Sequence, residues 1–167
     1  PYSPAHRQYT DTADTLEIKF ISEISDRFDY ILGYFNQTED MSRSQQTYIK
    51  GVNAWKGYYW GVDYVIDPNE QDFDYNVSES IDHEAFYGEF TFHLLKELDL
   101  TLGFRNFTSD ADANMNMSFK LYDIGPAVDT SSNSDSDTLL KANLSYKPAD
   151  DVTYFVTMSE GFRRGGV

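Results

Sequence analysis

Hydrophobic and polar positions alternate with a period of two through much of the chain. A period-two stretch of this kind, bounded by turn residues, is typical of a β-strand with one apolar face. The clearest example is 152–158, where Val152, Tyr154 and Val156 alternate with Thr153 and Phe155. The pattern predicts strands over residues 15–24, 28–38, 84–95, 98–108, 138–147 and 152–158.

The predicted connections alternate between short and long. Residues 25–27, 96–97 and 148–151 read as turns. Two long loops are predicted, at residues 39–82 and 109–137, and the first could contain an extra strand at 58–66. An irregular N-terminal segment is predicted at residues 1–14.

In an up-and-down meander alternate connections lie at the same end, so all the turns are expected at one end and both loops at the other. Outer-membrane barrels have this asymmetry, and a strand of about 9–11 residues spans a membrane. We therefore predict an all-β fold, an antiparallel meander of about six to eight strands that is part of a β-barrel or curled into one. Residues 15–167 would form this barrel segment. Four apolar residues fall on the otherwise polar faces and are expected to contact a plug domain or line the rim: Ile21, Ile31, Phe35 and Phe155.

Composition supports a barrel and excludes other classes. Aromatic residues make up 16% of the chain, which suits strands and the aromatic girdles of membrane barrels. There is no cysteine, so disulfides are excluded. The formal net charge of −15 excludes a nucleic-acid binder, which needs a basic surface. Most of the excess acid lies in the two predicted loops, either as solvated surface or as a surface that attracts divalent cations near lipopolysaccharide.

Several motifs resemble the barrel of TonB-dependent outer-membrane receptors. The last strand and its ending match a family motif of a tyrosine, a serine, Gly-Phe-Arg and a Gly-Gly pair. Residues 100–105, Leu-Thr-Leu-Gly-Phe-Arg, resemble a second family strand and are followed by Asp110 and Asp112. Residues 28–38 resemble an earlier hairpin strand. The residues that match the first motif are Tyr154, Ser159, Gly161, Phe162, Arg163, Gly165 and Gly166.

The resemblance implies a segment of an outer-membrane receptor of a Gram-negative bacterium that takes up a siderophore, haem, cobalamin or an oligosaccharide. It implies outer-membrane lipid, a small-molecule ligand and the TonB energy-coupling complex as partners, and no catalysis. The chain begins with Pro1 and has no signal peptide or apolar run long enough for a membrane helix. We expect it to be a piece of a larger protein, and the isolated piece to close, self-associate or aggregate. The alternative is a small self-contained β-barrel that binds an apolar ligand.

The candidate ligand-binding residues are four aromatics in the first predicted loop: Trp55, Tyr58, Tyr59 and Trp60. Exposed aromatic side chains stack on sugars or apolar ligands, but tyrosine and tryptophan also anchor proteins at a membrane interface or pack within loops. Both interpretations remain open at this stage.

No catalytic, metal or cofactor site is predicted. Asp110, Asp112 and Asn114 begin like a calcium-binding loop, but Met115 and Leu121 occupy the positions that require glycine and glutamate, so a solvated acidic loop is expected. The histidines lack the spacing of a metal site, and no nucleophile triad or nucleotide-binding motif is present.

Overall fold

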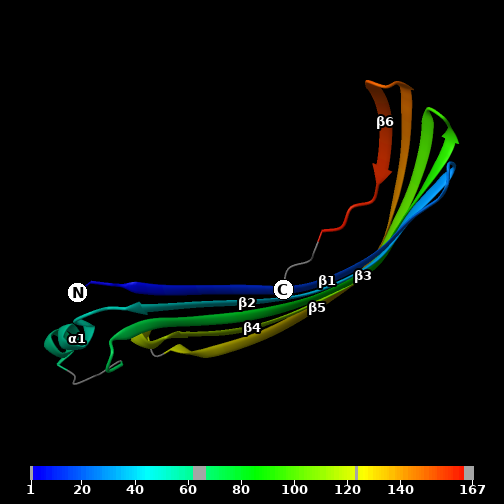
Figure 1. Ribbon diagram of the computed structural model, residues 1–167. Helices are drawn as coiled ribbons and strands as arrows, with labels where there is room; N and C mark the ends of the chain where they lie inside the picture. The colour runs from blue at the N-terminus through cyan, green and yellow to red at the C-terminus, as the bar shows by residue number, and fades with distance from the viewer. Residues whose placement is uncertain (1, 62–66, 123, 164–167) are drawn as a thin grey trace.

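The chain forms one antiparallel sheet in which the strands lie side by side in the order of the sequence, β1-β2-β3-β4-β5-β6. The computed structural model describes residues 2–61, 67–122 and 124–163. The sheet is long and strongly curved, and a short helix lies beyond one end (Figure 1). The elements are β1 (Ala5–Ser25), β2 (Phe28–Tyr48), α1 (Val52–Trp60), β3 (Gln71–Leu95), β4 (Leu98–Phe119), the 3-10 turn η1 (Lys120–Tyr122), β5 (Ile124–Ala149) and β6 (Val152–Ser159).

The predicted all-β meander is confirmed. β1 and β6 lie at opposite edges of the sheet, so the described strands form an open wall and not a closed barrel. A self-contained small barrel would require these two strands to meet. An open wall is instead the form expected of one section of a larger barrel.

The two-residue connections lie at one end of the sheet and the longer connections at the other. Residues 26–27, 96–97 and 150–151 make the turns at one end, called here the turn end. Residues 49–70 and 120–123 connect strands at the opposite end, called here the loop end (Figure 1).

The strands are much longer than predicted. β1 includes residues 5–14 of the predicted irregular segment. β2 and β3 include residues 39–48 and 71–82 of the first predicted loop, and the second predicted loop, 109–137, shrinks to the connection 120–123. These added lengths are rich in Ser, Thr, Asn and Asp, so hydrophobic alternation does not reveal them. They are strands because each has a neighbour that continues its backbone hydrogen-bond ladder.

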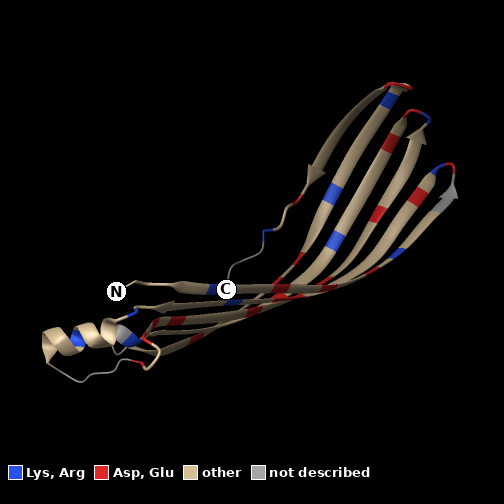
Figure 2. Cartoon of the chain, turned by 60° about the vertical axis from the view of Figure 1, so that its left-hand side comes forward, with Lys and Arg blue, Asp and Glu red and all other residues tan. Residues whose placement is uncertain are grey.

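The acidic residues are therefore distributed along strands as well as in connections (Figure 2). Asp110, Asp112 and Asn114, expected in a loop, alternate along extended β4. The extra strand predicted at 58–66 is also wrong where it is described, since residues 58–60 belong to helix α1 and residues 62–66 lie outside the described part.

One face of the sheet, called the outer face, is apolar in the half nearest the turn end. Register places equivalent positions of neighbouring strands side by side on this face. Many of these side chains are exposed, including Leu140 at 57% and Met158 at 74%. A row here means the residues that pair with one another across neighbouring strands. Two adjacent rows of the outer face are Phe20–Leu32–Gly88–Phe104–Leu140 and Ser22–Tyr30–Phe90–Leu102–Ala142–Met158.

The opposite face, called the inner face, carries a polar network in the same half. Lys141 Nζ lies 2.9 Å from Glu89 Oε2 on a strand two places away. His93 bridges two carboxylates, with 2.6 Å from Nδ1 to Asp99 Oδ1 and 3.0 Å from Nε2 to Asp29 Oδ2. These polar groups are paired across strands although they are only partly buried.

The inner face is also the concave face, and it holds the small apolar core. Phe107 is 2% exposed, and Ala85, its partner across the β3–β4 pair, is buried too. The segment after β6 crosses the concave side (Figure 1), and its Phe162 ring lies 4.2 Å, centroid to centroid, from that of Phe107. Curvature brings inner side chains together and spreads outer ones apart, so the polar and partly buried face is the inside of the curve.

Gly33 makes room for a hydrogen bond that crosses three strands. The Tyr87 side chain of β3 lies over Gly33 of β2, and its hydroxyl donates to Glu17 Oε1 of β1 at 2.7 Å. A Cβ at position 33 would lie 2.1 Å from the Tyr87 ring. Any side chain here must therefore displace the Tyr87 ring, whose hydroxyl makes the bond to Glu17.

We predict that Gly33→Ala destabilises the complete protein by about 1–3 kcal/mol, the usual range for overpacking. The measurement is denaturant unfolding in detergent. The control is Gly103→Ala on the same face, where the nearest atoms would lie 3.5 Å from the new Cβ, an ordinary contact. Equal stability of the two variants would contradict the role assigned to Gly33.

Candidate functional site

The four aromatic residues predicted as ligand contacts lie together on helix α1, at the loop end of the sheet. Tyr58 is 82% exposed and Trp55 44%. The rings contact one another, with centroid distances of 5.3 Å for Trp55–Tyr59, 5.9 Å for Trp55–Trp60 and 5.0 Å for Tyr58–Tyr59. We call this group, Trp55, Tyr58, Tyr59 and Trp60, the aromatic cluster.

Glycines bound the helix that carries the aromatic cluster. Gly51 and Gly61 have φ angles of 85° and 64°, in the left-handed region that glycine adopts without a steric penalty. The Gly61 N–H donates to Gly57 O at 3.2 Å, which closes the last turn. The helix therefore begins and ends at defined residues despite its short length.

A carboxylate from the far side of the connection caps the start of α1. Glu70 Oε2 accepts from Gly51 N at 2.9 Å, and Oε1 accepts from Asn53 N at 3.4 Å. The first N–H groups of a helix have no partner within it, and an acid there also favours the helix dipole. Glu70 thus fixes where the helix starts.

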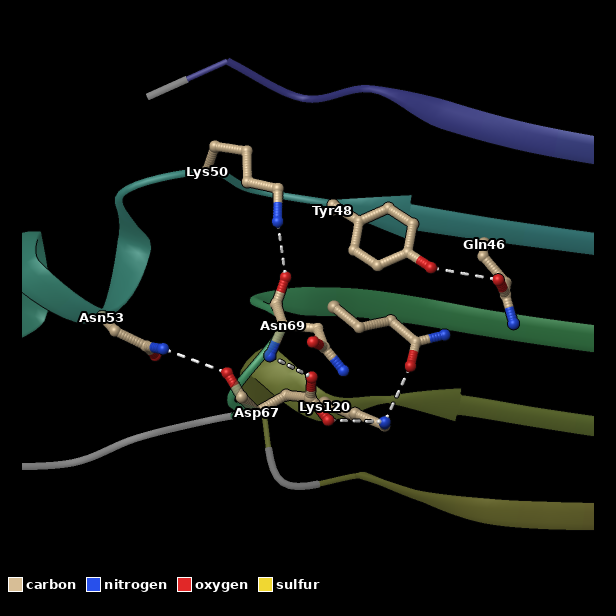
Figure 3. Close-up of polar contacts among 8 residues, drawn as sticks. Gln46, Tyr48, Lys50, Asn53, Asp67, Asn69 and Lys120 are labelled. Carbon is tan, nitrogen blue, oxygen red and sulfur yellow. Dashed lines mark hydrogen bonds and ion pairs between the residues drawn. The ribbon is translucent and has the colours of Figure 1, made fainter.

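Lys120 joins the two connections of the loop end (Figure 3). It belongs to η1, after β4, yet its Nζ donates to Asp67 Oδ2 at 3.1 Å and to Gln71 Oε1 at 2.8 Å. The Lys120 hydrogen bond holds the pKa of Asp67 below its ordinary value of 3.8. Asp67 therefore remains charged and paired at neutral pH.

Two further hydrogen bonds attach α1, and Lys50 just before it, to the same segment (Figure 3). Asn53 Nδ2 donates to Asp67 O at 3.0 Å, and Lys50 Nζ donates to Asn69 O at 2.7 Å. Together with Glu70 and Lys120, these residues form a polar scaffold beneath the aromatic cluster. Sequence reasoning missed the scaffold because its members lie up to 70 positions apart, and only Gly51 and Gly61 signalled that a short element lay between them.

The aromatic cluster exposes ring faces and edges. Such rings bind sugar C–H groups, other aromatic rings or organic cations. The helix itself contains a contact between a cation and a ring, since Lys56 Nζ lies 5.0 Å from the centroid of the Trp60 ring. Lys56 is the only charged residue of α1 (Figure 2) and is 5% exposed, so the exposed side chains of the helix are neutral.

Within the described residues no group of three or more His, Cys, Asp or Glu side chains is placed to hold a metal ion. None of the described helices has the length and hydropathy needed to cross a membrane.

A family model described as the β-barrel of TonB-dependent receptor-like proteins matches residues 2–167. This chain belongs to the TonB-dependent receptor family. The resemblance proposed from the sequence motifs is thereby confirmed. Of those motif residues, Gly165 and Gly166 lie outside the described part, and Phe162 packs on the inner face.

The ferric yersiniabactin uptake receptor FyuA from Yersinia pestis has a similar structure. It aligns with a TM-score of 0.71 and 14% identity over 92% of this chain and 21% of its own. At this identity the likeness shows the fold alone, and our TonB-dependent receptor segment spans about a fifth of that receptor's length. The KdgM porin, solved with a disordered oligogalacturonate, aligns at a TM-score of only 0.17 and 12% identity over 95% of this chain and 91% of its own. No curated protein matches the sequence.

TonB-dependent receptors are outer-membrane proteins of Gram-negative bacteria, so this chain is an outer-membrane receptor segment. The family consists of transport receptors and not of enzymes.

We predict that Lys120→Met loosens the helix of this TonB-dependent receptor without unfolding the barrel. The variant leaves Asp67 without its ion pair, and a partly exposed pair of this kind contributes up to about 1 kcal/mol. Amide hydrogen exchange in residues 52–60 should accelerate by up to about fivefold. Lys96→Met, at a turn of the opposite end, is the control and should leave exchange in α1 unchanged. Unchanged exchange in Lys120→Met would show that the scaffold does not order the helix.

Proposed function

We propose that the receptor containing this segment imports a scarce nutrient across the outer membrane and is energised by the TonB complex. In this proposal the loop end faces the exterior, the outer face of the turn-proximal half contacts lipid, and the aromatic cluster contacts the ligand. Candidate ligands are a ferric siderophore, haem, cobalamin or an oligosaccharide.

The observation that carries the proposal is the chemical difference between the two faces of the same strands. Phe90 and Leu102 pair on the outer face, while one position away Thr91 and Thr101 hydrogen-bond to each other at 3.1 Å on the inner face. A wall that is apolar outside and polar inside suits lipid on one side and an aqueous lumen on the other. Short turns at one end and longer connections at the other support the assigned orientation.

Distance from the apolar rows favours ligand contact over membrane anchoring for the aromatic cluster. Tyr34 lies in the last largely apolar row on β2, and β2 continues for fourteen more residues to Tyr48 before α1 begins. At about 3.3 Å per residue this is roughly 45 Å along the strand. With the usual tilt of about 35–45° it is roughly 30–35 Å above the apolar rows. An interfacial anchor belongs at the headgroup level, far below this position.

The orientation predicts which positions a membrane-impermeant maleimide can reach in intact cells. In the complete receptor, Tyr58→Cys at the loop end should label from outside. Asp150→Cys, in a turn of the opposite end, should label only after the outer membrane is permeabilised. The unsubstituted receptor gives the background. Labelling of Asp150→Cys in intact cells would reverse the orientation and remove the aromatic cluster from the exterior.

Uptake tests the role of the aromatic cluster directly. A strain lacking the receptor gene is grown with haemin, ferric desferrioxamine, cyanocobalamin or maltohexaose as the limiting source, and the complete gene is restored. Restoration should recover growth on one of these only where the TonB complex is intact. On that source, Trp55→Ala/Tyr59→Ala/Trp60→Ala should lower initial uptake at least tenfold, since each stacking contact contributes about 0.5–1.5 kcal/mol.

The matched controls separate ring contact from folding. Replacing the same three residues by phenylalanine keeps a ring face at each position and should retain most uptake. Tyr154→Ala, an aromatic removal on the outer face of β6, should leave uptake near the level of the unsubstituted receptor. Full uptake by the triple alanine variant would refute a ligand role for the cluster.

A further inference from the structure

The outer face changes character in the half of the sheet nearest the loop end. On β1 to β3 the last apolar row is Ile18–Tyr34–Phe86. Beyond it the outward positions become almost entirely hydroxyl, amide and carboxylate groups. Two consecutive rows show this across four strands: Thr12–Asp40–Ser80–Asp112 and Thr10–Ser42–Ser78–Asn114.

These two rows line a groove of about 350 Å³ on the outer face. All eight side chains are polar, and none is a lysine or arginine. The remaining lining residues, Met41 and Glu79, alternate toward the inner face. We call this feature the hydroxyl groove.

The chemistry of the hydroxyl groove fits a saccharide. Neighbouring strands lie about 4.8 Å apart and alternate outward residues about 7 Å apart, so the rows present a regular array of donors and acceptors to the hydroxyl groups of a sugar. Asp40 accepts from Ser80 Oγ at 2.7 Å, and a carboxylate has further acceptor sites to offer. With two carboxylates and no lysine or arginine, the groove disfavours a phosphate group, and without an apolar side chain on this face it has no partner for an acyl chain.

The position of the groove identifies the source of that saccharide. The groove lies on the same convex face as the apolar rows, and six residues of β1 separate Ile18 from Thr12. This is about 20 Å along the strand, or about 15 Å above the apolar rows at the usual tilt. The groove therefore faces the sugar layer that surrounds an outer-membrane protein, and not the lumen through which a ligand would pass.

We propose that the hydroxyl groove binds the core saccharide of lipopolysaccharide in the outer leaflet through direct hydrogen bonds. The inference requires that the apolar rows lie in the membrane, which is part of the function proposed above, but it does not depend on the ligand. The maleimide labelling tests the proposed orientation separately, so a failure of saccharide binding is distinguished from a failure of that orientation.

The test uses the complete receptor in detergent and the core oligosaccharide released from the lipopolysaccharide of the same strain and then dephosphorylated. Binding is followed by saturation-transfer NMR and titration calorimetry, with and without EDTA. The unsubstituted receptor should bind equally in both conditions. Ser42→Val/Ser78→Val should raise the Kd at least fivefold, because valine keeps the strand but removes two hydroxyl groups from the groove.

The control is Ser134→Val/Ser136→Val, the same two changes on the outer face of β5, outside the groove. It should bind within twofold of the unsubstituted receptor. Asp40→Asn keeps the shape of the side chain and should also weaken binding, which preserves the test if the valine variant fails to show the heat-dependent gel mobility of a folded barrel.

Three results would overturn the proposal. The first is no binding of the oligosaccharide by the unsubstituted receptor. The second is loss of binding in EDTA, which would show that divalent cations and not direct hydrogen bonds hold the sugar. The third is equal binding of maltohexaose, which would assign the groove to saccharides of the medium.

Discussion

The period of two along each strand, held in register across the whole sheet, is the constraint on which the rest of this segment depends. Each residue faces the side opposite to its neighbour, so one ladder sorts the sequence into two surfaces. In the row that contains Leu32 the outer face is apolar, while the adjacent inner row holds Ile31, Glu89 and Lys141. A slip of one residue would exchange the two surfaces. The two surfaces keep their different character only while the register is kept.

The register is fixed by interactions that cross more than one strand. The two-residue turns set it at one end. Within the sheet, Tyr87 reaches Glu17 over Gly33 on the inner face, and Phe104 covers Gly88 on the outer face. A large side chain over a glycine on the next strand fits in only one alignment, because moving the strand by two residues would place the ring against another side chain. These glycines therefore specify alignment as well as allowing close approach.

How far the sequence predicts the structure depends on whether hydrophobic side chains mark an element. The six strands, the turns and the placement of both longer connections follow from the alternation of residues such as Leu100, Leu102 and Phe104. The continuation of β2 and β4 toward the loop end does not follow from this alternation, because residues such as Ser42 and Asn114 are typical of loops when taken alone. Those residues are extended because neighbouring strands supply backbone partners, which no local pattern records. The aromatic cluster was predicted as a group, but the helix that assembles it depends on Glu70 and Lys120 from distant positions.

The same long-range dependence explains how a nine-residue helix holds the aromatic cluster in a fixed position. A helix this short is marginal alone, and helices of this length rely on packing for stability. Here the surface of α1 toward solvent is aromatic, so stability comes from polar contacts at its start and from the strands below. Lys120 adds to the stability of α1 because it belongs to the other connection, directly after β4, and binds Asp67 from there. The long polar strands place α1 at a distance from the apolar rows. A hydrogen-bonded sheet fixes the position of the helix there, whereas a flexible loop of the same length would not.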